Sequence, residues 1–290
     1  MIDILYPFEE KKQLDELVYI FKNANGNIVL WLGSGISKMA GYPLWNELAY
    51  ELIECYKRKH SDDIINKMLE NFYQKGDFLR ILETIKSKDE SLYKKEIQRI
   101  FNANPHSEKD KSILYTIKKF MEKGVIVITT NIDMELQRTL NLDDEKISIV
   151  PTREIRPTPK LIYLHGRIDK PESWVLTESD YAKAYDNSPR YCGKFLDGFL
   201  NQYPLVVIIG YSLREREIYR KFLKTESKPK IFWIQLIEKS EREEELKYQI
   251  SYFRDSLRFD IKPIFYKKDL TRLLEYIYNE AYRTTVWEAQ

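Results

Sequence analysis

Residues 27–37 read NIVLWLGSGIS, a mostly apolar run that passes directly into glycine and serine. Such a run is typical of a buried strand that feeds a glycine-containing turn. Short apolar runs of the same kind recur along the chain, at 125–129, 161–164, 205–209, 231–237 and 261–266. Helical patterns lie around them, at 8–25, 44–59, 239–252 and 269–282. This alternation predicts an α/β fold with an open, parallel, Rossmann-like sheet and helices on both faces.

Length and one long strand-free region bear on the domain organisation. The chain has 290 residues, which suits one large domain or two small ones. Residues 61–122 are largely polar and helical in pattern, and they contain no strand signal. We therefore expect a single domain over residues 1–290, with a helical insertion at about 61–122.

Composition excludes several kinds of protein. Lys and Arg total 47 against 45 Asp and Glu, so the net charge of +2 gives no electrostatic case for a nucleic-acid partner. Only two cysteines, Cys55 and Cys192, are present, too few for an all-cysteine zinc site. The longest apolar run, 203–211, is far shorter than the roughly 20 residues of a membrane-spanning helix. The N-terminus lacks the basic flank of a secretory signal. We expect a cytoplasmic protein that holds no metal and contacts no membrane.

Ligands of an open parallel sheet bind beyond the carboxyl ends of its strands. Small, polar or titratable residues follow four of the expected strands, as Gly33–Ser37, Thr130–Asp133, His165–Gly166 and Gly210–Ser212. The last two expected strands end without such a cluster. One edge of the sheet thus combines backbone N–H donors, hydroxyls, an amide, a carboxylate and an imidazole. This pattern predicts a nucleotide site.

The glycine segment has two interpretations. Gly33 and Gly35 permit close approach of a diphosphate to the backbone, and a following helix offers free N–H groups. The segment departs from the dinucleotide fingerprint GxGxxG, because Lys38 stands at the third glycine position. The phosphate-loop template GxxxxGK[ST] has no match. An ordinary strand-to-helix turn therefore stays open as the alternative.

Asn131, Asp133 and His165 are the candidates for chemistry. An amide at a strand end can hold a ribose hydroxyl or position a water, but Asn and Asp also favour helix N-caps. His165 ends an apolar run before a glycine, so its ring is expected to emerge at the sheet edge. There it would suit a general base near neutral pH, and a half-buried structural histidine is the alternative. His60 and His106 are interpreted as surface or locally hydrogen-bonded residues.

Together these segments resemble the motifs of the sirtuin family, in family order across about 27–220. Gly33–Ser37 with Gly41–Trp45 resembles the sirtuin glycine motif GAGxSxxxGxPxW or its form with Phe. Thr129–Asp133, TTNID, resembles the TTN-x-D or TQN-I-D motif, and Leu164–Gly166 resembles the HG motif. Gly210–Ser212 resembles the late glycine-serine loop that holds the adenosine ribose.

The resemblance implies an NAD site in an inverted-Rossmann-type fold. The NAD-binding residues that it implies are Gly33, Ser34, Gly35, Ser37, Thr130, Gly210 and Ser212. It implies that Gly33, Ser34 and Ser37 face the phosphates and ribose, and that Gly210 and Ser212 take the adenosine side. It also implies that Asn131 and Asp133 surround the nicotinamide ribose and that His165 is the general base.

Two departures from the family pattern narrow the expected function. Sirtuin deacylases carry a four-cysteine zinc ribbon after the HG motif, whereas only Cys192 follows it here. The deacylase arginine is also missing, because Trp45 leads to Asn46 and Glu47. The combination is similar to the zinc-free sirtuin-like domains of bacterial anti-phage defence systems.

That resemblance implies an NAD+ hydrolase, without metal, that acts as an antiviral effector by depleting NAD+. It implies a homo-oligomer or a partner such as a HerA-like ATPase or an Argonaute-type protein. The alternatives are an NAD-dependent deacylase or ADP-ribosyltransferase, and a non-catalytic nucleotide-binding module of a larger complex.

Overall fold

The computed structural model describes residues 9–23, 27–102, 111–186, 191–203, 205–213, 215–224, 229–237 and 240–282. Within these ranges the chain forms two compact units. Unit 1 takes Met1–Leu32, Lys111–Ile128 and Asp197–Gln290, and unit 2 takes Gly33–Asp110 and Thr129–Leu196. The expectation of one domain over 1–290 stays a prediction.

The strands confirm the expected parallel α/β fold. They are β1 (Ile28–Leu32), β2 (Ile126–Thr129), β3 (Ile147–Ile149), β4 (Leu161–Tyr163), β5 (Leu205–Ile209), β6 (Lys230–Leu236) and β7 (Ile261–Tyr266). Their order in the sheet is β3-β4-β2-β1-β5-β6-β7. The pairs β1–β5, β5–β6 and β6–β7 in unit 1 are parallel, as is β3–β4 in unit 2. The strand β3, which has three residues, was not expected from the sequence.

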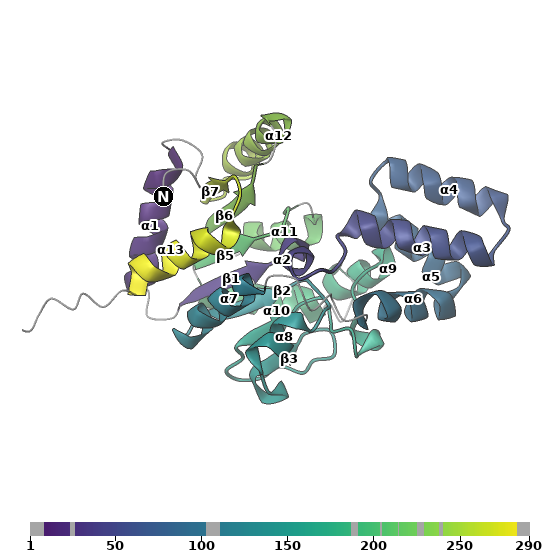
Figure 1. Cartoon of the computed structure of the whole chain (residues 1–290), viewed down its shortest axis with the longest axis horizontal. Coiled ribbons are helices and arrows are strands. Elements are labelled where there is room, and N and C mark those ends of the chain that lie inside the picture. The colour runs from purple at the N-terminus through teal and green to yellow at the C-terminus, as the bar shows by residue number, and fades with distance from the viewer. Residues whose placement is uncertain are drawn as a thin grey trace, which may run out of the picture. The chain divides into compact units, whose positions relative to one another are not determined.

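Apolar side chains explain the packing of unit 1. Its helices are α1 (Glu9–Asn23), α7 (Ser112–Glu122), α11 (Arg216–Lys224), α12 (Ser240–Ser251) and α13 (Leu270–Tyr282), with part of α10 (Tyr191–Gln202). The helices α1, α7 and α13 lie together (Figure 1). They meet at Phe120, whose ring contacts those of Phe21 and Tyr278. On α11, Phe222 packs against Trp31 of β1, and both side chains are buried.

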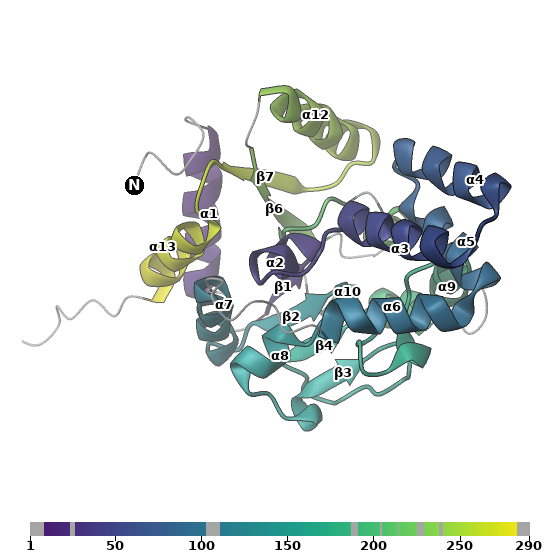
Figure 2. The same ribbon diagram turned by 45° about the vertical axis from the view of Figure 1, so that its right-hand side comes forward.

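Unit 2 consists of a helical bundle and the short elements around β3 and β4. The bundle contains α3 (Trp45–Lys59), α4 (Asp63–Gln74), α5 (Phe78–Lys88) and α6 (Glu90–Asn102), which lie side by side in Figures 1 and 2. Its core includes Ile81, Leu82 and Ile85 of α5, all with no exposed surface. The remaining helices are α2 (Ser34–Met39), α8 (Glu135–Leu140) and α9 (Glu178–Tyr181), the last followed by a π-helical turn at Ala182–Asp186. The described part of 61–122 is thus helical, as α4 to α7.

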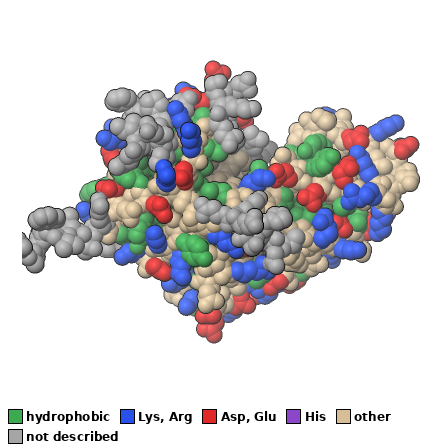
Figure 3. Space-filling view, in the orientation of Figure 1, with side chains coloured by type: hydrophobic (Ala, Val, Ile, Leu, Met, Phe, Trp, Pro, Cys, Tyr) green, Lys and Arg blue, Asp and Glu red, His purple; other side chains and the backbone are tan. Residues whose placement is uncertain are grey.

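The surface carries charges of both signs. Figure 3 shows Lys and Arg interspersed with Asp and Glu on the visible face, as the net charge of +2 leads one to expect. Among the described residues, no helix is both long enough and apolar enough to cross a bilayer.

Candidate functional site

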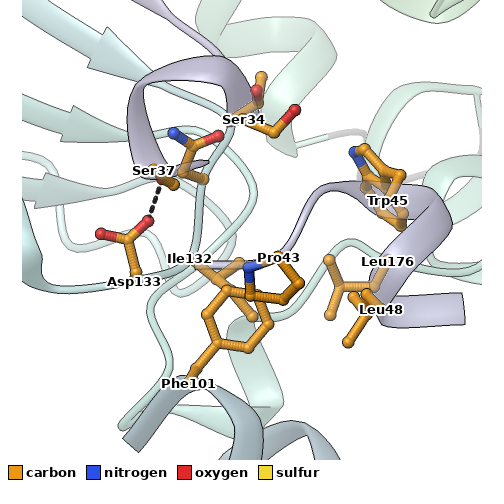
Figure 4. Close-up of a pocket in the computed structure, with 11 residues that line it drawn as sticks. Ser34, Ser37, Pro43, Trp45, Leu48, Phe101, Ile132, Asp133 and Leu176 are labelled. Carbon is orange, nitrogen blue, oxygen red and sulfur yellow. Dashed lines mark hydrogen bonds between the residues drawn. The ribbon is translucent and has the colours of Figure 1, made fainter. Parts of the chain in front are cut away.

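A pocket in unit 2 collects the residues that follow β1 and β2. Its lining residues are Ser34, Ser37, Pro43, Trp45, Leu48, Phe101, Thr130, Asn131, Ile132, Asp133 and Leu176. Figure 4 shows the two serines and Asp133 along one side, and Pro43, Phe101 and Leu176 along another. The space open to the centre of a water molecule is about 40 Å³. The pocket therefore has one polar edge, one apolar wall and room for a few waters.

The glycine segment turns into a helix at once rather than forming an extended loop. Gly33 has extended backbone angles, φ −107° and ψ −172°, and α2 starts at Ser34. The backbone N–H of Ile36 donates to the Gly33 carbonyl at 3.1 Å. Gly35 and Ser37 therefore lie within α2. Both interpretations of the segment expect a helix after the strand, so its part in phosphate binding stays a prediction. This turn still brings Ser34 and Ser37 to the pocket.

Asn131 ties the two strand ends together. Its backbone N–H donates to the Thr129 hydroxyl at 3.0 Å, and its Nδ2 donates to the Gly33 carbonyl at 2.8 Å. In the described part of the chain, its Oδ1 has no hydrogen-bond partner. Asn131 is not a helix N-cap, because that position of α8 belongs to Met134. Its free amide oxygen can accept a hydrogen bond from a hydroxyl or a water.

Asp133 is buried at the base of the polar edge. The Ser37 hydroxyl donates to Asp133 Oδ2, and the Glu135 backbone N–H donates to Oδ1 at 3.0 Å (Figure 4). The second bond supports the start of α8, although the N-cap position of that helix is Met134 and not Asp133. Burial raises the pKa of Asp133, and the two hydrogen bonds oppose that rise. This carboxyl thus joins the glycine segment to the strand end of β2.

His165 does not line the pocket, contrary to the expectation that its ring emerges at the sheet edge. The ring has no exposed surface. Its Nε2 shares a 2.7 Å hydrogen bond with the Tyr185 hydroxyl, and its Nδ1 lies 3.4 Å from the Tyr181 hydroxyl. Burial lowers the pKa of His165 to about 3. The imidazole is therefore neutral at pH 7, and its role as general base stays a prediction.

The turn after His165 explains this enclosure. Gly166 has φ +92°, and a Cβ placed on it would lie 2.2 Å from the Ser173 carbonyl oxygen, so only glycine fits. The following loop folds back, and the Val175 N–H donates to the His165 carbonyl at 3.0 Å. Arg167, which is buried, fixes that loop through two hydrogen bonds to Asp169.

Gly210 and Ser212 belong to unit 1. Gly210 follows β5 with φ +63°, which turns the chain sharply. The Tyr211 carbonyl accepts hydrogen bonds from Trp233 Nε1 and Gln235 Nε2. Ser212 is exposed, and its carbonyl accepts from Gln249 Nε2 at 2.9 Å. This turn is fixed by β6 and α12, and its expected part in a nucleotide site stays a prediction.

Sequence reasoning missed most of the apolar wall. Leu48 of α3, Phe101 of α6 and Leu176 reach the pocket from segments far apart in the chain. Their helical spacing identifies Leu48 and Phe101 only as inward-facing. Pro43 and Trp45 stood within the glycine motif but were given no role. A pocket wall made by several helices has no local sequence signal.

The remaining described cysteines and histidines lie apart from the pocket. No group of three or more His, Cys, Asp or Glu among the described residues could hold a metal ion. Both cysteines are free and buried, and burial raises the pKa of Cys192 to about 12 and also raises that of Cys55. His60 pairs with Asp89 at 2.9 Å, whereas His106 lies outside the described residues.

The parallel sheet and the pocket at its strand ends define a Rossmann-like α/β protein. Residues 125–253 match the family model described as SIR2-like domain, a segment that includes Asn131, His165 and Ser212. One similar solved structure is described as "Structural Basis for the Mechanism and Regulation of Sir2 Enzymes". It is 14% identical with a TM-score of 0.47, over 93% of this chain and 97% of that chain. No curated protein matches the sequence.

Proposed function

We propose that the protein hydrolyses NAD+ to ADP-ribose and nicotinamide. The observation that carries this proposal is the single pocket that joins Ser34 and Ser37 to the segment Thr130–Asp133. These are the segments whose motifs resemble the sirtuin NAD site. The match of residues 125–253 to the SIR2-like domain supports the same substrate.

The chemistry of the pocket suits a pyridine ring joined to a ribose. Trp45, Phe101 and Leu176 offer apolar surface for a flat ring, and aromatic contacts of this kind favour offset or edge-on packing. The amide oxygen of Asn131 would accept from a ribose hydroxyl or from the attacking water. Asp133 would orient the loop or stabilise the positive charge that develops on the ribose.

Hydrolysis breaks the bond between the ribose carbon and the nicotinamide nitrogen. The electron pair of that bond passes to the pyridine nitrogen, which neutralises its charge, while positive charge develops on the ribose. A water oxygen then bonds to the same carbon, and its proton goes to a base. His165 is the residue proposed to accept that proton, a role worth roughly 10²–10⁴-fold in rate.

In this proposal the reaction serves prokaryotic antiviral defence by depleting NAD+. A second copy of the chain, a HerA-like ATPase or an Argonaute-type protein would control it. The support for these finer points is the resemblance alone, together with the need to restrain an activity that consumes a central metabolite.

A non-catalytic nucleotide-binding module is the second candidate, because the His165 ring lies off the pocket. Release of nicotinamide separates the two. The purified chain is incubated with NAD+, alone and with the product of its neighbouring gene, and products are identified by mass spectrometry. Free ADP-ribose would support hydrolysis, acyl or protein-linked ADP-ribose would support transfer, and tight binding without nicotinamide release would support the module.

Substitutions connect the activity to the pocket. Asn131→Ala and His165→Ala are each expected to reduce nicotinamide release by about 100-fold or more while the fold is retained. Asn201→Ala is the matched control, because this exposed amide on α10 donates to the Asp197 carbonyl and to no other described residue. Equal activity in all three variants would contradict the assignment.

A further inference from the structure

Two tyrosines enclose the His165 imidazole. Tyr181 ends α9, and Tyr185 lies in the π-helical turn that follows it. Their rings stack on each other with centroids 5.8 Å apart, and each meets the imidazole edge-on, at 5.1 and 5.9 Å. Both tyrosines are almost fully buried. We call this pair, Tyr181 and Tyr185, the tyrosine latch.

The tyrosine latch is hydrogen-bonded to the ring nitrogens of His165, and one of these nitrogens must be free to accept a proton. A neutral imidazole has one N–H and one accepting nitrogen. Because both nitrogens face tyrosine hydroxyls, neither is presented to the pocket. Burial adds to this effect, since it disfavours the protonated ring that a general base must become.

The backbone of His165, in contrast, lies beside the pocket. The Leu164 N–H donates to the Thr129 carbonyl and the Ile168 N–H donates to the Ile132 carbonyl, both at 2.8 Å. Ile132 lines the pocket. Leu176 also lines it, and its neighbour Val175 donates its N–H to the His165 carbonyl. The segment around His165 is therefore hydrogen-bonded to the strand end of β2, which lines the pocket.

We propose that the tyrosine latch holds His165 in an inactive position and that α5 keeps the latch closed. This inference rests on the proposed function, in which His165 accepts a proton. Opening the latch frees an imidazole nitrogen, and the same movement exposes the ring to solvent.

Burial argues against a proton relay through the tyrosines. Tyr181 and Tyr185 are 3% and 2% exposed, and neither lines the pocket. A hydroxyl that does not reach the pocket cannot take a proton from a substrate there. Tyr185 lies in a π-helical turn, a rare geometry that concentrates at functional sites.

Helix α5 is tied to α9 by three polar contacts. Lys86 Nζ lies 2.6 Å from Asp180 Oδ1, and this ion pair is largely shielded from solvent. The Ser179 N–H donates to Glu83 Oε2 at 2.9 Å. Arg80 and Glu178 form a third, exposed pair at 3.3 Å. A partner or ligand that displaces α5 would therefore pull on the segment that carries the latch.

The first test removes one hydroxyl and measures access to His165. Diethyl pyrocarbonate labels exposed imidazoles, and the labelled peptides are measured by mass spectrometry with partly exposed His60 as reference. Wild-type His165 is expected to react at least tenfold more slowly than His60. Tyr185→Phe is expected to speed labelling of His165 by roughly three- to tenfold, the effect of one lost hydrogen bond. Nicotinamide release should rise by a similar factor.

The matched control is Tyr93→Phe. Tyr93 on α6 is equally buried, and its hydroxyl has no partner in the described part of the chain. This variant is expected to change neither the labelling of His165 nor nicotinamide release.

The second test weakens the contacts between α5 and α9 and leaves Tyr181 and Tyr185 unchanged. Lys86→Ala is expected to raise both readouts by about two- to fivefold, within the range of a partly buried ion pair. Lys57→Ala is its control, because Lys57 pairs with Glu70 and Glu54 inside the same bundle rather than with α9. This pair keeps the inference testable if Tyr185→Phe does not fold.

Several results would overturn the inference. One is wild-type His165 that reacts as fast as His60, and another is labelling that neither Tyr185→Phe nor Lys86→Ala changes. A Tyr185→Phe variant that loses nicotinamide release as Asn131→Ala does would make the hydroxyl part of the reaction. Faster labelling without nicotinamide release from any variant would retain the latch and refute the proposed function.

Discussion

Asn131 and His165 follow neighbouring strands, yet their side chains end in opposite surroundings. The Asn131 amide lines a pocket and is partly exposed, whereas the His165 imidazole is sealed among tyrosines. The chain after each strand makes the difference. After β2 it runs through Asp133 directly into α8, but after β4 it turns at Gly166 and folds back over its own strand end. A place at the edge of a sheet thus positions the backbone, while the following segment decides where the side chain points.

The pocket and the enclosure of His165 have the same effect on the charge of a buried side chain. Burial raises the pKa of Asp133 and lowers the pKa of His165, so both sites favour the neutral form of the residue. They differ in what surrounds that form. Asp133 receives hydrogen bonds from Ser37 and Glu135 at the pocket, while His165 is shielded from it.

The largest expected effect comes from the turn that encloses His165. Gly166→Ala places a Cβ 2.2 Å from the Ser173 carbonyl oxygen at φ +92°. It should lower the free energy of unfolding by about 3–5 kcal/mol, from overpacking together with the strain of positive φ. Gly76→Ala is the control, since φ is +69° there but no described atom lies within 4 Å of an added Cβ. Urea unfolding of the two variants measures the contrast, and equal losses would show that the enclosure is loosely packed.

A second prediction concerns the pH dependence of stability. The folded pKa of His165, about 3, lies below its ordinary value of 6.5, so the unfolded chain takes up the proton first as pH falls. His165 should therefore stabilise the fold fully above pH 6.5, and lose up to about 1.4 kcal/mol per pH unit below it. His165→Gln should flatten the plot of unfolding free energy against pH between about 6 and 4. An unchanged slope in urea titrations at these pH values would mean that His165 is accessible in the folded protein.

Asp133 should act with the opposite sign. Its pKa is raised in the folded state, so protonation favours the folded chain as pH falls. Asp133→Asn removes this contribution and should steepen the loss of stability in acid. The pair of variants therefore reports on the pocket and on the enclosure in one experiment.

The smallest effect is expected at the pocket edge. Ser37→Ala removes the hydroxyl that donates to Asp133 and should cost about 1 kcal/mol of stability. Ser87→Ala is its control, because within the described ranges that exposed hydroxyl donates to the Thr84 carbonyl of its own helix alone. Thermal unfolding distinguishes the two, and an effect of Ser37→Ala no larger than that of Ser87→Ala would remove Ser37 from the pocket's framework.

Most of the fold was predictable because long apolar runs mark buried parallel strands. All six expected strands occur within about one residue of their predicted ends, including Leu205–Ile209. The strand Ile147–Ile149 escaped notice because three residues carry too little pattern. Likewise α9 is a single turn and gives no helical periodicity.

The candidate site was predictable where its residues directly follow the ends of expected strands. Ser34, Ser37 and Asn131 gather at one pocket, as the strand-end argument expects. The surroundings of His165 depend on Tyr181 and Tyr185, which a local pattern identifies only as aromatic residues of a helix. Contacts with residues further along the chain set the direction of a side chain at a turn. The local pattern of a single sequence does not predict these contacts.

The two native thiols have a practical consequence for following the protein in motion. Since Cys55 and Cys192 are buried and held protonated, neither is a good nucleophile for an alkylating dye. Lys183 is exposed in the turn between Tyr181 and Tyr185. A fluorophore attached through Lys183→Cys would thus be the dominant label on the wild-type background, and its emission would track rearrangement of that turn in real time.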